Sequence, residues 1–462
     1  MATKPLKRPR NPLQLAKLIG DIASFNSTSC WYQVMSKLQN NQHLFWIVIV
    51  AFVARAAVRW HLGETDFWIN GYTFFFDLAQ NIATGKGIAF EGEPATAFRV
   101  PLYPAFLATV TFGHKEFVAV LLSQSLIGAA TVWCTALIAR QMFGDAAATI
   151  AASLAAIYPY YVVHDTALQE TSLYTFLTVL SVLLLMRARR NGSRSMAACA
   201  GLTLGAAVLT RANLAPFAVL APLWLVLPVR STAVPRRRRF LTCLLCAGVV
   251  ALTVSPWLVR SYWLTGSPTL STESGFFLWL GNNPYTFSHS PNESIDVSQD
   301  VALEALSPEE KAEIEALRTN EAAVDQWFLR KGLDYMREHP WQTLVNGVRK
   351  IGAAFCWLPS PRKSFWPNLV YLLSYAPVMI LGMWGMWAGR QHWCEHLIFY
   401  ALFVSFVAVT AVFFGSTNYR AYLDVYWIVF AAGSLEQLRS KCFSTTGQTN
   451  KNYSARTGSS EK

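Results

Sequence analysis

Long apolar runs recur along the chain, and shorter segments that carry most of the charges separate them. A transmembrane helix needs about 20 consecutive, mostly apolar residues, and about ten of these runs approach or reach that length. We therefore predict an all-α polytopic membrane protein with about ten transmembrane helices. The predicted spans are residues 43–62, 117–139, 146–163, 171–186, 196–209, 214–229, 240–258, 365–388, 394–414 and 422–435.

Two connections on the same predicted side of the membrane are long. The first, 63–113, contains an amphipathic stretch at 72–82 and an apolar stretch at 102–112 that is about half a span. We expect the second of these stretches to lie along the interface or to enter it partway. The other connection, 259–364, is predicted to contain a helical region outside the membrane, because Ser307-Pro308-Glu309-Glu310 has the pattern of a capping box with proline at the first helical position.

These features predict five regions. They are a cytoplasmic tail at 1–42, an N-terminal transmembrane module at 43–258, an outer helical segment at 259–364, C-terminal transmembrane helices at 365–436 and a disordered cytoplasmic tail at 437–462. No internal repeat and no second globular domain are apparent in the sequence.

Composition and charge support a membrane protein. The chain is 53% hydrophobic and only 14% charged, whereas soluble domains contain about 25% charged residues. Its net charge of +12 comes from Lys and Arg that cluster in short connections between the apolar runs. The positive-inside rule places such connections in the cytoplasm, so the charge does not indicate nucleic-acid binding. The basic connections are 140–145, 187–195, 230–239 and 390–393, and an even number of spans returns both termini to the cytoplasm.

The eight cysteines do not form a disulfide or metal-binding pattern. Cys243 and Cys246 have C-x-x-C spacing but lie inside an apolar run, where cysteine usually acts as a small hydrophobic residue. No second pair and no histidine cluster has the spacing of a zinc site.

Acidic residues on the predicted outer side are candidates for catalysis, because ionisable groups close to the membrane are costly to retain. A sugar transfer needs a carboxylate to accept the proton of the acceptor hydroxyl or to hold a metal ion. Asp66, Asp77 and Glu170 lie among apolar and aromatic residues, and we predict them as catalytic. His164 and Asp165 are predicted to position an acceptor or a metal, with an interfacial, backbone-bonded side chain as the alternative for His164. The other acidic residues of the first outer connection, Glu64, Glu91 and Glu93, fit a solvated loop face equally well.

Four arginines, Arg99, Arg211, Arg260 and Arg420, fall on the predicted outer side, against the positive-inside bias. A guanidinium group presents a planar fork of donors that suits phosphate oxygens. We predict that these four residues bind the phosphate of a lipid-linked donor, whose oxygens take up charge as the sugar leaves. An ordinary snorkelling arginine is the alternative for each one taken alone, and Arg55, inside the first span, fits a structural ion pair.

Several short motifs resemble those of the GT-C superfamily of membrane glycosyltransferases (glycosyltransferase family 39-like). This superfamily includes the relatives of protein O-mannosyltransferases and of the aminoarabinose transferase that acts on lipid A. Residues 77–87 and 97–104 resemble the first outer loop of the family. The remaining similarities, in chain order, are Gln169-Glu170, Leu209-Thr210-Arg211, Pro256-Trp257-Leu258-Val259-Arg260, Gly281-Asn282-Asn283-Pro284 and Asn418-Tyr419-Arg420.

The resemblance implies a polyprenyl-phosphate sugar donor, an outward-facing cavity, and an acidic residue of the first outer loop as the catalytic base. The family has this acidic residue several positions before the pair Leu78-Ala79, where the present chain has Gly71 and Tyr72. Asp66 lies further upstream and Asp77 further downstream, so the base stays open between them. Two further departures are Val100 in place of a common proline and Ser261 in place of an asparagine.

We therefore predict a membrane glycosyltransferase that moves a sugar from a polyprenyl-phosphate donor to a lipid, glycan or protein acceptor on the non-cytoplasmic face. The resemblance favours a bacterial inner membrane, with the active site facing the periplasm or exterior. The expected partners are the donor, membrane lipids and the acceptor, and a divalent cation is left open as a cofactor. The alternatives are a transporter or flippase, which the absence of repeated halves disfavours, and an assembly subunit that has lost catalytic activity.

Overall fold

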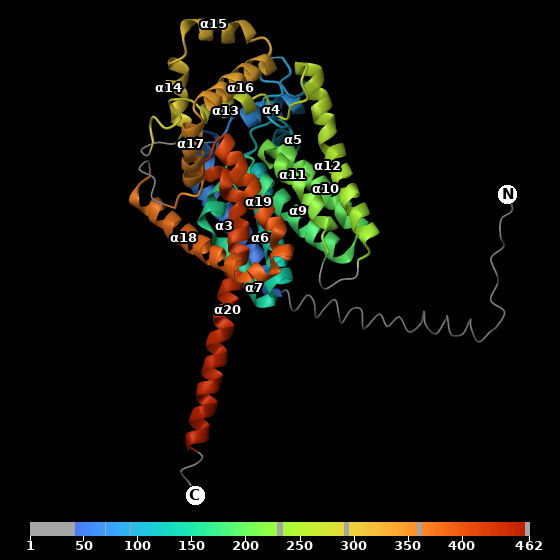
Figure 1. Ribbon diagram of the computed structural model, residues 1–462, viewed down its shortest axis with the longest axis vertical. Coiled ribbons are helices and arrows are strands. Elements are labelled where there is room, and N and C mark those ends of the chain that lie inside the picture. Colours follow the sequence, from blue (N-terminus) through green and yellow to red (C-terminus); the bar gives the residue numbers. More distant parts are fainter. Residues whose placement is uncertain are drawn as a thin grey trace, which may run out of the picture. The chain divides into compact units, whose positions relative to one another are not determined.

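The computed structural model describes residues 42–69, 71–92, 94–228, 234–290, 295–357 and 363–457, and their side chains as far as residue 440 with the exception of residue 296. Contacts divide the chain into residues 1–46 and 47–462, and the second unit contains nearly all of the described residues. The predicted tail at 1–42 lies outside the described residues except for its last residue. All regular elements of the described part are helices (Figure 1), which confirms the predicted all-α membrane fold.

The described helices follow one another along the chain as α3 (Gln42–Ile69), α4 (Phe74–Ala83), α5 (Leu102–Thr111), α6 (Phe117–Phe143), α7 (Asp145–Ile157), α8 (Pro159–His164), α9 (Thr171–Asn191), α10 (Arg194–Thr210), η1 (Ala212–Leu214), α11 (Ala215–Leu223), η2 (Trp224–Val226), α12 (Arg236–Thr265), α13 (Ser274–Leu280), η3 (Ile295–Val297), α14 (Ser298–Glu304), α15 (Pro308–Leu317), α16 (Glu321–Glu338), α17 (Pro340–Ala354), α18 (Phe365–Ala388), η4 (Gly389–His392), α19 (Trp393–Val412) and α20 (Thr417–Thr457).

Five helical segments of the described part are long and apolar enough to cross a membrane. They are Gln42–Ile69, Phe117–Phe143, Thr171–Asn191, Arg236–Thr265 and Phe365–Val412, the last of which joins α18 and α19 through η4. The other predicted spans correspond to shorter apolar helices or to α20. The span predicted at 146–163 is divided between α7 and α8, because Pro159 lacks the N–H that an unbroken helix needs.

Small residues bring the central helices close together. α10 packs against both α9 and α12, and it carries Gly201 and Gly205 four residues apart. A Cβ atom at Gly201 would lie 2.5 Å from the carbonyl oxygen of Cys246, and one at Gly205 would lie 2.6 Å from Cβ of Thr253. This spacing of small residues is typical of helix packing inside membranes, where van der Waals contact replaces the hydrophobic effect.

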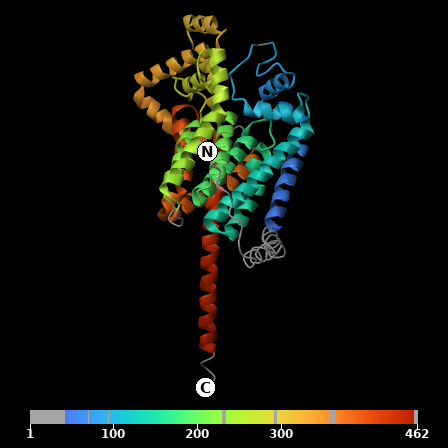
Figure 2. The same cartoon turned by 90° about the vertical axis from the view of Figure 1, so that its right-hand side faces the viewer.

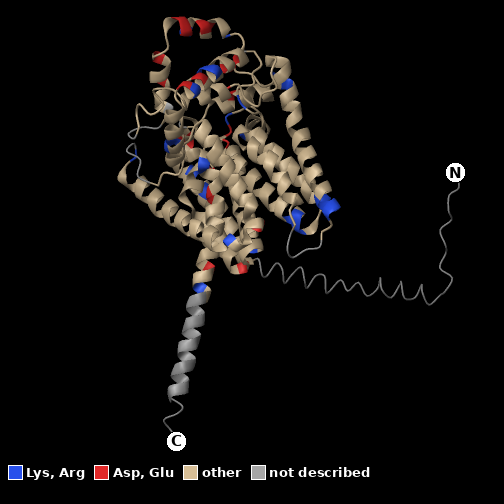
Figure 3. Ribbon diagram, in the orientation of Figure 1, with Lys and Arg blue, Asp and Glu red and all other residues tan. Residues whose placement is uncertain are grey.

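The two long connections form helices at one end of the bundle, at the top of Figures 1 and 2. α4 and α5 come from the first connection, and α13 to α17 come from the second. The capping box is confirmed: the Ser307 hydroxyl accepts from the Glu310 amide at 3.2 Å, and the Glu310 carboxylate accepts from the Ser307 amide at 2.8 Å. Figure 3 shows the acidic residues of α15 at this end, and basic residues gathered at the opposite end of α12.

The last helix is longer than the predicted final span. α20 includes residues 422–435 and continues as a single helix to Thr457, whereas the sequence analysis expected a disordered tail from residue 437. No proline interrupts residues 417–457, so every backbone N–H of this stretch is able to take part in helical bonding. Residues 458–462 of the predicted tail lie outside the described residues.

A buried lysine fastens the second connection to the end of α19. The ammonium group of Lys350 donates to the carbonyl oxygens of Gly281, Val412 and Phe413 at 3.1–3.2 Å, and to the side chain of Asn282 at 3.3 Å. The Asn282 amide also donates to the Val412 carbonyl at 2.7 Å. The motif Gly281-Asn282-Asn283-Pro284 therefore packs the second connection against the end of α19.

We expect the substitution Gly281→Ala to weaken this contact between the second connection and the end of α19. A Cβ atom there would lie 1.7 Å from the Phe413 carbonyl oxygen, and because that atom belongs to the backbone, the two segments must move apart. Overpacking of this kind costs about 1–3 kcal/mol. The expected result is faster amide hydrogen exchange in α13 and α17, measured by mass spectrometry. Gly352→Ala is the control, because a Cβ at Gly352 meets nothing within 4 Å; equal exchange in both variants would contradict the prediction.

Candidate functional site

A cavity of about 860 Å³ lies where the two long connections meet the ends of the membrane helices. It is lined by eight stretches of the chain, several of which lie far apart in sequence. The lining residues are Tyr72, Phe74, Phe75, Phe98, Arg99, Gln169, Glu170, Arg211, Thr272, Glu273, Phe276, Phe277, Gln299, Ile314, Glu315, Arg318, Glu321, Val324, Asp325, Phe328, Ser416, Asn418 and Tyr419. Its wall contains both aromatic rings and charged groups, a combination that is typical of small-molecule binding sites.

One ion pair of the cavity joins two residues that the sequence analysis selected. Nε and Nη2 of Arg211 lie 2.9 and 2.8 Å from the same oxygen of Glu170, Oε1. The guanidinium also lies 5.2–5.3 Å from the ring centres of Tyr174 and Tyr419. Nη1 of Arg211 and Oε2 of Glu170 are both buried without a hydrogen-bond partner. Buried polar groups are rarely left unsatisfied, so this pair retains one donor and one acceptor for a ligand.

The turn before α9 places Glu170. The side-chain amide of Gln124, on α6, donates to the carbonyl oxygens of Asp165 and Ala167 at 2.7 and 2.8 Å. The Tyr103 hydroxyl donates to Gln124 Oε1 at 3.1 Å. Glu170 comes directly after this turn and immediately before the first residue of α9. The hydrogen bonds of Gln124 therefore fix the backbone that carries the Glu170 side chain.

Arg211 has its position because α10 ends there. The residue is extended, with φ −153° and ψ 114°, and the chain turns through η1 into α11, which has Pro216 in its first turn. Its amide still donates to the Ala207 carbonyl at 2.9 Å. The guanidinium therefore leaves the helix end on the side of the cavity.

A second ion pair joins the two long connections. Nε of Arg99 lies 2.9 Å from Oε2 of Glu273, and three phenyl rings surround the guanidinium with ring centres at 5.3–5.8 Å. These rings belong to Phe74, Phe98 and Phe277. Cation–π contacts of this kind hold a cation in place without neutralising it.

The environment of Glu273 raises the pKa of its carboxyl group. Burial raises the pKa of its carboxyl group from 4.5 to about 7, although Arg99 opposes the shift by favouring the charged form. Asp325 and Glu170 raise this pKa further through their charges. A group that titrates near neutrality is both partly ionised and basic enough to accept a proton. Glu273 is not among the residues predicted from the sequence, because it lies in a polar run, 271–274, that has the appearance of an ordinary loop.

Glu321 holds the loop that carries Arg99. Its carboxylate accepts from the hydroxyls of Thr96 and Thr272 at 2.8 and 2.7 Å and from the amide of Ala97 at 2.9 Å. The Ser271 hydroxyl donates to the Phe98 carbonyl at 2.6 Å. The first connection is thereby bonded to the second directly beside the Arg99–Glu273 pair.

The two aspartates predicted as alternative bases do not line this cavity. Asp66 lies 2.7 Å from Nη1 of Arg59, near the end of α3. Asp77 is exposed on α4, and partial desolvation raises the pKa of its carboxyl group while Lys115 lowers it. Tyr72, at the place where the family has its acidic residue, does line the cavity. Gly71 before it is required by close packing, because a Cβ there would lie 2.5 Å from Cβ of Leu168.

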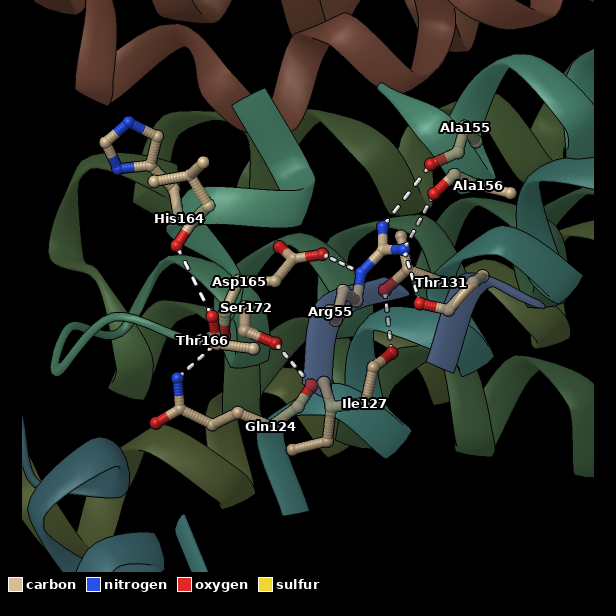
Figure 4. A network of polar contacts seen from close by, with 12 residues as sticks. Arg55, Gln124, Ile127, Thr131, Ala155, Ala156, His164, Asp165, Thr166 and Ser172 are labelled. Atoms are coloured by element: carbon tan, nitrogen blue, oxygen red, sulfur yellow. Dashed lines mark hydrogen bonds and ion pairs between the residues drawn. The ribbon is translucent and has the colours of Figure 1, made fainter. Parts of the chain in front are cut away.

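His164 and Asp165 also lie outside the cavity lining. Asp165 is buried, and Oδ2 accepts from Nε of Arg55 at 2.8 Å. The Arg55 fork then donates to the carbonyl oxygens of Ala155 and Ala156 (Figure 4). The ring of His164 points away from this network in Figure 4 and stacks on Tyr160, with ring centres 4.1 Å apart.

Arg260 and Arg420, the other two predicted phosphate ligands, do not line the cavity and bind other protein groups. Arg260 donates to the carbonyl oxygens of Thr96 and Ile88 at 2.9 and 3.1 Å, which braces the first connection. Arg420 is fully buried, and its Nε lies 3.1 Å from Oδ1 of Asp424. Asp424 is a second acidic residue that the sequence analysis missed, because it lies inside an apolar span.

The structure thus brings together three of the predicted residues, Glu170, Arg99 and Arg211, and adds Glu273 to them. Among the described residues, no three His, Cys, Asp or Glu side chains form a group able to hold a metal ion. An acidic residue next to an aromatic pair, here Phe276 and Phe277 after Glu273, is the signal that could have identified it.

Two comparisons relate this chain to known proteins. Residues 99–259 match the family model of dolichyl-phosphate-mannose-protein mannosyltransferases. The oligosaccharyltransferase AglB of Archaeoglobus fulgidus, in complex with an inhibitory peptide and a dolichol-phosphate, is 14% identical with a TM-score of 0.51, over 90% of this chain and 52% of that chain. The same archaeal enzyme tethered to an acceptor peptide has a TM-score of 0.53 at 14% identity, over 88% and 50% of the two chains.

The chain spans about half the length of these archaeal enzymes. ArnT of Cupriavidus metallidurans bound to undecaprenyl phosphate is 13% identical with a TM-score of 0.38, over 86% of this chain and 78% of that chain. No curated protein sequence matches the chain. The predicted resemblance is confirmed: the chain has a GT-C-type fold and is similar to the membrane glycosyltransferases of the GT-C superfamily.

Proposed function

We propose that this protein transfers a sugar from a polyprenyl-phosphate donor to a hydroxyl group of an acceptor in the cavity between the two long connections. The observation that carries the proposal is the pairing, in one cavity, of an arginine with a free buried donor and a glutamate whose pKa is about 7. Glycosyl transfer requires both groups, because negative charge develops on the leaving phosphate while the acceptor loses a proton.

Arg211 is the proposed ligand of the donor phosphate. Its Nε and Nη2 are held by Glu170, so Nη1 is oriented before a ligand arrives. An oriented donor in a site shielded from water stabilises a phosphate oxygen more than a mobile side chain does. Glu170 is therefore proposed as the residue that positions Arg211, and its unpaired Oε2 is available to an acceptor or sugar hydroxyl.

Glu273 is the proposed base. Its carboxylate accepts the proton of the acceptor hydroxyl while the hydroxyl oxygen forms a bond to the anomeric carbon of the sugar. The bond between this carbon and the phosphate oxygen breaks, and its electron pair leaves with the polyprenyl phosphate. Arg99 keeps part of the Glu273 population ionised, because its positive charge lowers the glutamate pKa. A divalent cation as cofactor stays a prediction, tested by adding a chelator to the assay.

Two further features support a lipid-linked donor. The archaeal enzyme of similar fold is described in complex with a dolichol-phosphate, and the family model that matches residues 99–259 is named for dolichyl-phosphate-mannose as donor. The cavity lies at the end of the bundle opposite the basic N-terminus of α12. If the positive-inside rule sets the orientation, the cavity faces the non-cytoplasmic side, which in a bacterial inner membrane is the periplasm.

The proposal is tested by sugar transfer with the purified full chain in lipid, offered a panel of radiolabelled polyprenyl-phosphate sugars with cell-envelope lipid, glycan and peptide acceptors. We expect at least one donor to support transfer. Arg211→Gln should lower the rate by about 10²–10³-fold, because removal of one oriented donor to a developing charge has that effect.

Arg318→Gln is the matched control. Arg318 lines the same cavity, but its side chain is 76% exposed and pairs with the equally exposed Glu315, so we expect its rate to change by less than about threefold. Equal rates for the two variants would remove Arg211 from the phosphate site. Transfer from no donor by the folded protein, together with movement of the labelled lipid between membrane leaflets, would favour the flippase alternative.

A further inference from the structure

A second cavity, of about 540 Å³, lies at the opposite end of the helices that line the first. It opens among the ends of α6, α9 and α18, the beginning of α19, and α20. Glu170 precedes α9 and lines the first cavity, whereas Arg189 near the end of α9 lines the second. Since α9 has 21 residues, the two cavities lie about 30 Å apart, a distance near the hydrocarbon thickness of a bilayer.

Two buried polar atoms of this cavity have no partner. Arg189 is 4% exposed, and its Nε makes no hydrogen bond, although Nη2 donates to the Pro228 carbonyl at 3.0 Å. His396 is 6% exposed, and its Nδ1 makes no hydrogen bond. Two unsatisfied buried groups in one cavity are costly unless a ligand satisfies them. The guanidinium of Arg189 is fixed by Trp224, whose ring centre lies 4.2 Å from it.

The charged groups of the cavity favour an anion as its ligand. Arg190 lies at its exposed rim, and Glu395 supplies the single carboxylate of its lining. Met142 and Met186 contribute apolar side chains to the same lining. Exposed arginines at the start of α12 lie at the same end of the bundle (Figure 3). Basic pockets between transmembrane helices bind the phosphate head groups of anionic lipids.

The backbone is also adapted to the cavity. Gly389, in η4, lies against the ring of His396, so that a Cβ atom there would be 2.8 Å from Cε1. Any larger residue would displace the histidine ring. The glycine thus preserves the space beside the unpaired Nδ1.

We propose that this second cavity is a binding site for a phosphate group, most closely fitted by the phosphate head group of a membrane lipid, with Arg189 and His396 as its hydrogen-bonding residues. The site is separate from the cavity proposed for sugar transfer, and it does not depend on that function.

The test measures ligand binding by native mass spectrometry with the full chain in a non-ionic detergent. Every protein carries Arg211→Gln, so that the first cavity does not contribute a phosphate site. The probes are dioctanoyl phosphatidic acid, dioctanoylglycerol (which has the same chains without phosphate) and inorganic phosphate. We expect phosphatidic acid to bind at least about tenfold more tightly than dioctanoylglycerol, the difference that one charged hydrogen bond makes.

Three substitutions assign the binding to this cavity. Arg189→Gln should weaken phosphatidic acid binding about tenfold, whereas Arg194→Gln, which removes an exposed charge near the same end of the bundle, should change it less than about twofold. Glu395→Gln should strengthen binding by about threefold, because it removes the carboxylate that repels the phosphate. This gain cannot result from misfolding.

Competition by millimolar inorganic phosphate would identify a free phosphate group as a ligand, and its absence would assign the site to the lipid head group. The proposal is overturned if dioctanoylglycerol binds as tightly as phosphatidic acid. It is also overturned if Arg189→Gln and Arg194→Gln bind equally and Glu395→Gln leaves binding unchanged.

Discussion

Replacement of Glu273 by glutamine is expected to lower the rate of sugar transfer by about 10²–10⁴-fold, the range that a positioned general base contributes. The side chain keeps its size and its place beside Arg99, but it can no longer accept a proton. Glu315→Gln is the matched control, because Glu315 lines the same cavity with a side chain that is 71% exposed. A rate within about threefold of the unmodified protein for both variants would remove Glu273 from the reaction.

The pH dependence gives a second measurement of the same role. The raised pKa of about 7 means that Glu273 is protonated, and unable to act as a base, at lower pH. Transfer should therefore fall as the pH decreases below about 7. In Arg99→Gln, the charge that lowers this pKa is removed. The acidic limb of the pH–rate profile, where the rate falls with decreasing pH, should therefore move to higher pH. A limb that stays at the same pH in Arg99→Gln would show that another group limits the rate.

The same assay decides among the predicted bases. Asp66→Asn and Asp77→Asn should retain most of the activity, since neither aspartate lines the cavity. Loss of activity in one of them, with Glu273→Gln still active, would return the role to the first outer connection, as the family resemblance implies.

Asp165→Asn is expected to destabilise the fold by about 3–5 kcal/mol. The substitution leaves the guanidinium of Arg55, which is 0% exposed, without its carboxylate partner, and a buried charge that loses its partner has a cost of this size. The measurement is thermal unfolding of the purified protein in detergent. Asp145→Asn is the control: this aspartate also pairs with an arginine, but its side chain is 83% exposed, so the effect should be less than about 1 kcal/mol.

A double-mutant cycle separates this structural role from the predicted positioning of an acceptor. Arg55→Met together with Asp165→Asn should be more stable than Asp165→Asn alone, because the unpaired charge is then absent. Well below the unfolding temperature, Asp165→Asn should keep its KM for the acceptor. An increased KM with unchanged stability would support acceptor positioning by Asp165.

The sequence carries enough information for the helical elements outside the membrane. The start of α15 follows from local chemistry, since Ser307 and Glu310 bond to each other's backbone across a single turn. α4 and α5 also lie where the amphipathic and short apolar stretches predict them. Proline had an effect that hydropathy alone did not anticipate: Pro159 divides one predicted span into α7 and α8.

The site was only partly accessible from sequence. Arg99, Glu170 and Arg211 were selected because charged residues beside apolar spans are expensive to retain, and these three do share a cavity. The same argument selected Arg420, but it could not show that Asp424, one turn further along α20, would occupy its guanidinium. A charged residue beside a predicted span therefore needs a partner, but the sequence does not show whether this partner is a ligand or another side chain.

The amino-acid sequence by itself determined that this chain is an all-α membrane protein, because apolar run length, basic connections and capping residues act locally. Only the tertiary structure decided which charged side chains share a cavity. Glu273 and Arg99 are 174 residues apart, yet they form an ion pair beside the bonds by which Glu321 holds the two connections together, and the burial that raises the Glu273 pKa arises there. Desolvation and pairing depend on distances in space, and the order of residues along the chain does not specify them.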